Sequence, residues 1–208
     1  MTDQSKRALS QQQTHDALAK AGAELIAKNG FAGASVRDIA KRAGYTQGAF
    51  YSNFKSKEDL VFAVLRSQFQ YAYVTIEEFS KDTTKPVTQM VMQAAQWLDE
   101  ICGSNENTQL ETEISLHALR DPVFAKTYYA LLDDHAAKMA QIVQAATDAR
   151  QLRLRAPVSL VAMGMISMAR GLKLMAPHYD PQFVRQTLAV FLESVIQPAS
   201  DDAGHKAE

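Results

Sequence analysis

The segment from Ser35 to Lys57, SVRDIAKRAGYTQGAFYSNFKSK, constrains the fold of this chain more than any other. Ser35 is a favourable N-cap residue, and the apolar residues after it recur at helical spacing, which predicts a short helix of two turns. Gly44 then ends this helix, because it can take the left-handed conformation that a tight turn requires. Thr46 caps a second predicted helix over 47–54, whose two phenylalanines lie one turn apart. Two short helices joined by a turn of three residues are typical of a helix-turn-helix.

The outward face of the second predicted helix carries groups suited to the edges of DNA bases. In a helix-turn-helix, the N-terminal part of the second helix lies in the major groove. Gln47 can pair with adenine through two hydrogen bonds, Gly48 allows a close approach of the backbone, and the methyl group of Ala49 can meet a thymine methyl. Arg37 can reach guanine or phosphate. The alternative is that Gly48, Ala49 and Ser52 form an ordinary solvated helix face.

Basic residues gather at the same end of the chain. Tyr51, Lys55 and Lys57 suit phosphate contacts, which set register and give salt-dependent affinity without reading sequence. Residues 1–57 hold nine Lys and Arg against four Asp and Glu, although the whole chain has a formal net charge of -1. This confined positive charge is the expected footprint of a nucleic-acid surface.

The motifs of this segment resemble a known family. The stretches GF-x-G-x-SVRDIA, AGYTQGAFYSNF and KSKEDL, which end at Leu60, are similar to the DNA-binding domain of the TetR family of bacterial regulators. The resemblance covers roughly residues 14–65, and it implies a three-helix, homeodomain-like domain that binds operator DNA. The predicted DNA-contacting residues, from the chemistry and from the resemblance together, are Ser35, Arg37, Thr46, Gln47, Gly48, Ala49, Tyr51, Asn53, Lys55 and Lys57.

The rest of the chain shows helical patterns and no strand pattern, so the predicted fold class is all-α. We expect a disordered tail over 1–13, the DNA-binding domain over 14–58, a helical ligand-binding and dimerisation domain over 59–197, and a second disordered tail over 198–208. The stretch RQLRLRAP is expected to be a basic connector. The predicted helices cover about residues 14–29, 36–43, 47–54, 57–80, 86–101, 109–120, 121–149, 157–175 and 181–196.

Cysteine content and hydropathy exclude several classes of protein. Cys102 is the only cysteine, so an internal disulfide and a multi-cysteine zinc site are excluded. It is expected to be a small residue in the core or at a helix end, with a redox-sensing thiol as the alternative. No apolar run approaches the 18 or more residues of a membrane span, and the N-terminus is too polar for a signal peptide. We therefore expect a cytoplasmic protein, and no cofactor.

The last two predicted helices are apolar around much of their circumference, and the first of them carries small residues at helical spacing. Such helices suit a four-helix interface between two copies of the chain, which is also the arrangement that the resemblance implies. The alternative is a purely intramolecular core. The predicted interface residues are Val161, Gly164, Met165, Met168, Gly171, Leu172, Leu188, Phe191, Leu192 and Val195.

Aromatic, histidine and methionine residues in the second domain are candidates for a small-molecule pocket. Stripes of this kind at helical spacing are also common in plain core, and this alternative stays open. Glu113 and His117 stand four residues apart and could chelate a metal with His135, although no metal is predicted. The predicted ligand-binding residues are Trp97, His117, Phe124, Tyr128, His135, Met139 and Met163.

The resemblance implies a homodimeric repressor that a small, largely apolar inducer releases from a palindromic DNA site. The long helix over 57–80 is the candidate lever between the two predicted domains, because no glycine or proline interrupts it. A helical enzyme with a DNA-binding domain is one alternative, and an architectural DNA-binding protein without a ligand is another. The sequence offers no phosphate loop, nucleophile motif or catalytic cluster for the enzyme.

Overall fold

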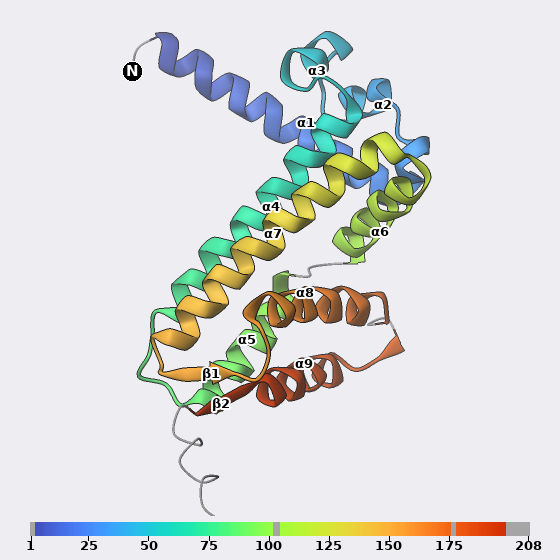
Figure 1. Cartoon of the computed structure of the whole chain (residues 1–208). Coiled ribbons are helices and arrows are strands. Elements are labelled where there is room, and N and C mark those ends of the chain that lie inside the picture. Colours follow the sequence, from blue (N-terminus) through green and yellow to red (C-terminus); the bar gives the residue numbers. More distant parts are fainter. Residues whose placement is uncertain (1–2, 102–104, 176–177, 199–208) are drawn as a thin grey trace, which may run out of the picture. The chain divides into compact units, whose positions relative to one another are not determined.

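The computed structural model describes residues 3–101, 105–175 and 178–198, and helices make up nearly all of them (Figure 1). The predicted all-α class is confirmed, apart from one short pair of strands. Cys102 lies outside the described residues. Within them the helices are α1 (Asp3–Gly33), α2 (Val36–Arg42), α3 (Gln47–Asn53), α4 (Lys57–Ser80), α5 (Val87–Ile101), α6 (Asn105–Arg120), α7 (Pro122–Asp148), α8 (Val158–Met175) and α9 (Pro181–Val195), and the strands are β1 (Leu152–Leu154) and β2 (Ile196–Pro198).

The chain forms two compact units. The first unit contains Met1–Phe69 and Ser104–Tyr129, and the second contains Gln70–Gly103 and Ala130–Glu208. Helices α4 and α7 therefore contribute residues to both units. The two units are defined by how the chain packs and not by what each part does. The predicted boundary between the DNA-binding domain and the second domain, after residue 58, therefore stays a prediction.

In the first unit, α1, α2, α3 and the start of α4 share one apolar core. Leu18, Ile26, Ile39, Phe50 and Leu60 have no exposed surface. Each lies on the inward face of its helix, as the spacing of apolar residues predicts. The long α4 is confirmed as one continuous helix.

Helix α1 begins at Asp3, so the prediction of a disordered tail over residues 1–13 was wrong for the described part of that segment. Polar contacts one turn apart replace apolar burial here. Gln12 Nε2 donates to Asp16 Oδ1 at 2.8 Å, and Thr14 Oγ1 donates to the carbonyl of Ser10 at 2.9 Å. The Gln12–Asp16 pair supports an exposed, largely polar helix that gives no periodic apolar signal.

In the second unit, the later part of α4 packs with α5, α7, α8 and α9. Val91, Met139, Val161 and Leu188 are among its most buried residues. The guanidinium of Arg150, after α7, donates to the carbonyls of Ser80 (3.0 Å) and Asp82. Arg150 thus fixes the loop that follows α4 to the end of α7.

The strands form an antiparallel ribbon, with Leu152 opposite Pro198 and Leu154 opposite Ile196. The prediction of a connector at RQLRLRAP, and of helices only, was wrong at this point. Leu152 and Leu154 are half-buried while Arg153 between them is exposed, which is the period-two pattern of a strand. Three residues are too few to indicate a strand from sequence, and the pairing partner lies more than 40 residues away.

Helix α8 is, among the described residues, the one helix long and apolar enough to cross a membrane by length and composition. The prediction that no run approaches this length overlooked it, because Arg170 and Lys173 interrupt the strictly apolar sequence. One side of α8, including Val161 and Met165, belongs to the core of the second unit.

Candidate functional site

The turn between α2 and α3 is closed by backbone hydrogen bonds. The Tyr45 amide donates to the Ala40 carbonyl at 2.8 Å, and the Gly44 amide donates to the Lys41 carbonyl at 3.1 Å. This is a Schellman motif, which needs a left-handed residue, and Gly44 has φ 79°. Ser35 Oγ accepts the amide of Asp38 at 3.1 Å and so caps α2, as predicted. The angle between the two helices is therefore set by local chemistry.

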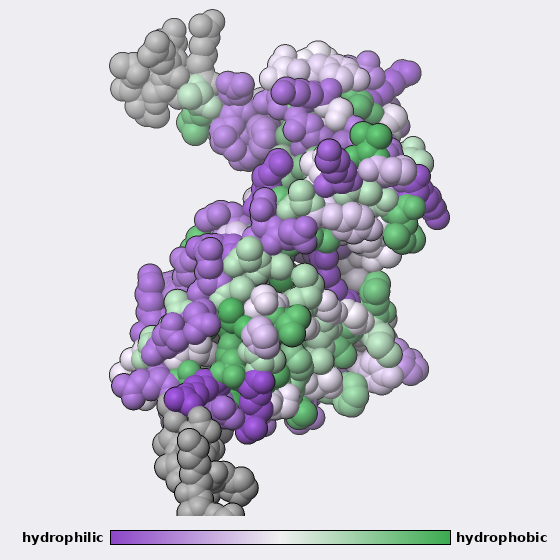
Figure 2. All heavy atoms as spheres, in the orientation of Figure 1, coloured by the Kyte–Doolittle hydropathy of each residue, from purple (hydrophilic) through white to green (hydrophobic). Residues whose placement is uncertain are grey.

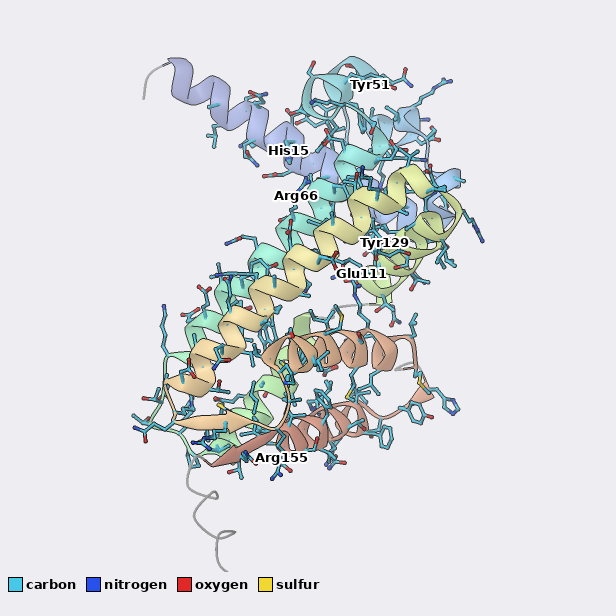
Figure 3. All side chains as sticks on the ribbon, viewed as in Figure 1. His15, Tyr51, Arg66, Glu111, Tyr129 and Arg155 are labelled. Carbon is cyan, nitrogen blue, oxygen red and sulfur yellow. The ribbon has the colours of Figure 1, made fainter. Side chains whose placement is uncertain are left out.

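Helix α3 is held to the core on one side and open on the other. Thr46 Oγ1 accepts the Ala49 amide at 3.2 Å and caps the helix. Phe50 is fully buried, and its ring lies 5.6 Å from that of the buried Phe54. Tyr51, by contrast, is 60% exposed and projects from α3 (Figure 3). The N-terminal half of α3 is thus an exposed surface on a rigid support.

The ten predicted DNA-contacting residues all lie in the first unit, between Ser35 and Lys57, and they differ in how far their polar groups are engaged. Ser35 and Thr46 serve as caps, and Asn53 Nδ2 donates to the Ala49 carbonyl at 2.8 Å. A Cβ added at Gly48 would have only Thr46 Oγ1 nearby, at 3.6 Å, so the backbone there is open to a close neighbour. The members with exposed side chains and few internal contacts are Arg37, Gln47, Tyr51 and Lys55.

Lys57 has an internal role that the sequence did not indicate. Its ammonium donates to the carbonyl of Phe31 and, at 3.0 Å, to that of Ala34, and it lies 4.2 Å from the centre of the Phe31 ring. Burial lowers the pKa of Lys57, with an opposing effect from Glu58. Lys57 therefore ties the start of α4 to the end of α1, and two of its three donors are occupied.

The aromatic residues predicted to bind ligand in the first unit form a packed cluster instead. His117 stacks on Phe31 with ring centres 3.8 Å apart, and Phe124 lies 4.6 Å from His117. The Tyr128 hydroxyl lies 2.9 Å from Ser115 Oγ. These contacts favour the alternative of plain core for His117, Phe124 and Tyr128.

The four other predicted ligand residues lie in the second unit. Trp97 Nε1 donates to Thr75 Oγ1 at 2.8 Å, and His135 Nδ1 lies 2.9 Å from the Tyr73 hydroxyl. Burial, with a smaller effect of Arg170, lowers the pKa of His135 to about 4, while burial and Asp134 raise the pKa of Tyr73 to about 12. Met139 is buried, and Met163 is 44% exposed.

The metal alternative receives no support from residues 3–101, 105–175 and 178–198, where no three His, Cys, Asp or Glu side chains gather. His117 and Glu113 belong to the first unit, and His135 belongs to the second. Glu113 instead packs against Gly30, with its Oε2 3.0 Å from the place where a Cβ on Gly30 would stand.

The second unit contains an apolar cavity of ≈ 60 Å³, larger than the ~15 Å³ that one water needs. None of the seven predicted ligand residues lines it. The sequence did not indicate this cavity, because its walls come from five helices and both strands. The lining residues are Ile76, Ser80, Met90, Val91, Ala94, Val143, Ala146, Thr147, Leu154, Val161, Met165, Leu192, Val195 and Ile196.

Most of the ten residues predicted for the dimer surface have little exposed surface within their own chain. Val161, Met165, Leu188 and Leu192 are buried within their own chain, and several of the other predicted residues are half-buried in the same core. Gly164 lies against the ring of Phe191 of the same chain. Of the ten predicted residues, only Gly171 is exposed.

Helices α8 and α9 expose several large apolar residues, and Figure 2 shows hydrophobic surface in this part of the second unit. The two helices are apolar around most of their circumference, so spacing alone could not tell the inner face from the outer one. The exposed residues, here called the α8–α9 patch, are Leu160, Met163, Leu174, Met175, Phe183 and Val190.

Comparison with known proteins agrees with this geometry. Residues 18–64 match the model of the bacterial regulatory proteins of the tetR family. The chain is 29% identical over 118 residues to the fatty acid metabolism regulator protein of Bacillus subtilis, covering 54% of this chain and 61% of the relative. It is 33% identical over 75 residues to the HTH-type transcriptional repressor KstR2 of Mycolicibacterium smegmatis, covering 36% and 37%. The aligned parts thus span less than two thirds of these relatives.

A solved structure supports the fold of the whole chain. The transcriptional regulator FadR from Bacillus subtilis, in complex with stearoyl-CoA, superposes with a TM-score of 0.68 at 18% identity, covering 85% of this chain and 96% of that one. The helix-turn-helix geometry and the match over residues 18–64 identify the N-terminal part of the chain as the DNA-binding domain of the tetR family of bacterial regulatory proteins, and the rest of the chain shares the fold of such a regulator.

Proposed function

We propose that the protein is a cytoplasmic DNA-binding transcriptional regulator, most simply a homodimeric repressor that a small, largely apolar molecule releases from a palindromic operator. The observation that carries this proposal is the exposed N-terminal half of α3, which begins with Gln47 and rests on a buried phenylalanine pair. The N-termini of both helices of the motif are capped, so the surface is pre-organised for the major groove.

Within this surface, reading of bases and binding of phosphates fall to different residues. Gln47 is exposed at the first position of α3, where its amide can pair with adenine. Arg37 can reach guanine or phosphate, and Tyr51 and Lys55 suit phosphate contacts. The Arg42 guanidinium is paired with Glu24 at 2.8 Å, which leaves it less suited to a phosphate than Arg37.

The α8–α9 patch supports a dimer. Leu160, Met163 and Leu174 fall on one side of α8 at i, i+3 and i+14, and Phe183 and Val190 are exposed on α9. Large apolar side chains exposed on two packed helices are candidates for an interaction site. A second copy presents the same patch, so two-fold pairing would bury both. Two α3 helices about 34–36 Å apart would then read half-sites in successive major grooves.

Release by a ligand requires only a modest coupling between two sites. A coupling free energy of about 1–3 kcal/mol weakens DNA binding roughly 5- to 150-fold. Helix α4 runs unbroken from Lys57 to Ser80 and contributes to both units, and so it is our candidate lever. A similar fold binds stearoyl-CoA, and one relative is a named repressor, which supports a ligand-responsive repressor here.

The test of DNA recognition is fluorescence anisotropy with the DNA upstream of the gene and with unrelated DNA. Wild type should bind the upstream DNA specifically, and its affinity should fall about 10³-fold between about 50 and 200 mM salt. Gln47→Ala should reduce the preference for specific over unrelated DNA, whereas Tyr51→Phe should weaken binding to both. Gln141→Ala, an exposed glutamine on α7 of the second unit, is the control. Binding that neither α3 variant changes would contradict the proposed surface.

The test of the dimer is sedimentation velocity of Met163→Asp. A carboxylate in the α8–α9 patch should shift the protein to monomer with an unchanged helical circular dichroism spectrum. Val74→Asp, which changes a comparably exposed residue of α4, should remain dimeric. A dimeric Met163→Asp would place the interface elsewhere.

A further inference from the structure

We propose that the first turns of α1 form a second DNA contact, which binds the phosphates beside the half-site that α3 reads. This segment, residues 3–16, is here called the α1 arm. The contact adds salt-dependent affinity and lengthens the bound site, and it does not read base sequence. The inference rests on the proposed function, because it extends the proposed DNA surface to a segment outside the helix-turn-helix.

The α1 arm has no place in the core of its unit. Residues 8–13 are all exposed, and the first fully buried residue of α1 is Leu18. Figure 1 shows the start of α1 projecting past the other helices of the first unit. An unsupported helix of about 12–15 residues is marginal in water, so a partner that binds the arm would also stabilise it.

The chemistry of the α1 arm suits phosphate better than a protein surface. Residues 4–15 contain Lys6 and Arg7 and no Asp or Glu, and Gln, Ser and Thr make up most of the others. All of these side chains bind phosphate oxygens in protein–DNA complexes. A helix that docks in a protein groove needs apolar anchors at successive turns, whereas Leu9 is the one large apolar residue of the arm. The two carboxylates of the arm stand at its two ends.

The α1 arm leaves the unit beside the end of α3. The ring centre of His15 lies 4.5 Å from that of Phe54, the residue at the C-terminus of α3. The helix from Asp3 to His15 is about 18 Å long at about 1.5 Å per residue. The major groove is about 12 Å wide and the minor groove about 6 Å. The arm is therefore long enough to reach phosphates beyond the groove that α3 occupies.

The register of α1 shows which face of the arm continues the DNA surface. Arg42 of α2 lies 2.8 Å from Glu24, so this face of α1 meets the helix-turn-helix. Gln13 and Lys6 precede Glu24 by 11 and 18 residues, which is about three and five turns at about 3.6 residues per turn. They fall on the same face of α1. The face that meets the helix-turn-helix thus continues into the arm with positions suited to phosphate.

The first experiment is fluorescence anisotropy of the full-length protein with two labelled duplexes of equal length, one from the upstream DNA and one of unrelated sequence. The variant Lys6→Gln/Arg7→Gln removes both charges of the arm. Its slope of log affinity against log salt should fall by about 1.8 for each bound protomer on both duplexes, since one phosphate contact contributes about 0.9. The ratio of wild-type to variant affinity should then be about 12-fold larger at about 50 mM than at about 200 mM salt.

The matched control removes the same charge from the second unit. Lys81→Gln/Arg155→Gln replaces two exposed cations that belong to no proposed DNA contact. Its salt slope should equal that of wild type, which separates a local contact from the effect of net charge. Circular dichroism should give the same helix content for both double variants.

The second experiment trims the specific duplex from its ends until only the two half-sites remain. Wild-type affinity should fall on trimming to that of Lys6→Gln/Arg7→Gln, whose own affinity should change by less than about twofold. New flanking sequence at full length should leave wild type within about twofold, because phosphates carry no sequence. Gln11→Pro breaks the helix between the basic residues and the core, and it should bind the long and trimmed duplexes alike.

Three outcomes would overturn the inference: equal salt slopes for wild type and Lys6→Gln/Arg7→Gln, a tenfold dependence on flanking sequence, or wild-type behaviour of Gln11→Pro. If the slopes are equal while binding to the upstream DNA stays specific, the inference fails and the proposed regulator stands. If wild type prefers no sequence, but the slopes still differ on the unrelated duplex, the arm binds DNA and the proposed regulator fails.

Discussion

Replacing Lys57 by methionine tests two roles that fall on one residue. The sequence places Lys57 among the phosphate contacts, whereas the structure uses its ammonium to hold the carbonyls of Phe31 and Ala34. Methionine keeps an unbranched stem of similar length and removes the charge and all three donors. The variant should therefore weaken both folding and DNA binding.

The expected loss of stability follows from the contacts of the ammonium group. Hydrogen bonds to a charged group contribute about 1.5–3 kcal/mol each. The Phe31 ring, 4.2 Å away, adds about 0.5–1 kcal/mol as a cation–π contact. Burial of the charge opposes these gains, as the lowered pKa of Lys57 indicates. We expect a net loss of about 2–3 kcal/mol in the free energy of unfolding, since the group is only partly buried.

The assay is urea unfolding followed by circular dichroism, with Lys55→Met as the matched control. Lys55 is exposed, so its replacement should change the free energy of unfolding by less than about 0.5 kcal/mol. Both variants should lower the slope of log affinity against log salt by about one, because each removes one predicted phosphate contact. Equal stability of Lys57→Met and Lys55→Met would refute the internal role of Lys57.

Two further predictions concern histidine and glycine. The pKa of His135 is lowered to about 4 from 6.5, so the unfolded state binds the proton first as pH falls. The contribution of neutral His135 to the free energy of unfolding is complete above about pH 6.5 and falls by about 3 kcal/mol as pH drops to about 4. Thermal melts of His135→Asn should lack this pH dependence, whereas those of the exposed His178→Gln should keep it. Gly30 has φ 77° and ψ 163°, a region open almost only to glycine, and a Cβ there would also approach Glu113. In urea unfolding, Gly30→Ala should lower the free energy of unfolding by about 3 kcal/mol. Gly44→Ala should lower it by about 1 kcal/mol, because its added Cβ meets nothing within 4 Å. Equal losses for the two variants would contradict this ranking.

The helix-turn-helix could be predicted because its determinants are local. Ser35 and Thr46 cap their helices from within three residues, and Gly44 forms the turn through its own backbone conformation. Phe50 and Phe54 face inward because they lie one turn apart. Signals of this kind are complete within a short stretch, so no knowledge of the rest of the chain was needed.

The features that the sequence did not disclose depend on residues far apart in the chain. The strand partner of Leu152 is Pro198, and the partners of the Lys57 ammonium are 23 and 26 residues away. The same reason applies to α8, where a helix that is apolar on most sides gives no period. Its buried face, with Val161 and Met165, could be distinguished from its exposed face only once α5 and α9 were in place.

The predicted ligand site shows the limit of composition as a guide. Trp97 and His135 have the chemistry of a binding site, yet each already has a hydrogen-bond partner in the core. Wall positions such as Ala94 and Ala146 have no chemistry that marks them in a sequence. A cavity is the space that side chains leave, and that space appears only after packing.

The most direct test of the regulator is selection of binding sites from random double-stranded DNA, with wild type and Gln47→Ala in parallel. We expect a palindromic motif for wild type, with half-site centres about one helical turn apart or a multiple of it. Gln47→Ala should select a motif that has lost its preference at one base pair in each half-site and is otherwise the same. Failure of wild type to enrich any motif, or identical motifs for both proteins, would contradict the claim that α3 reads DNA through Gln47.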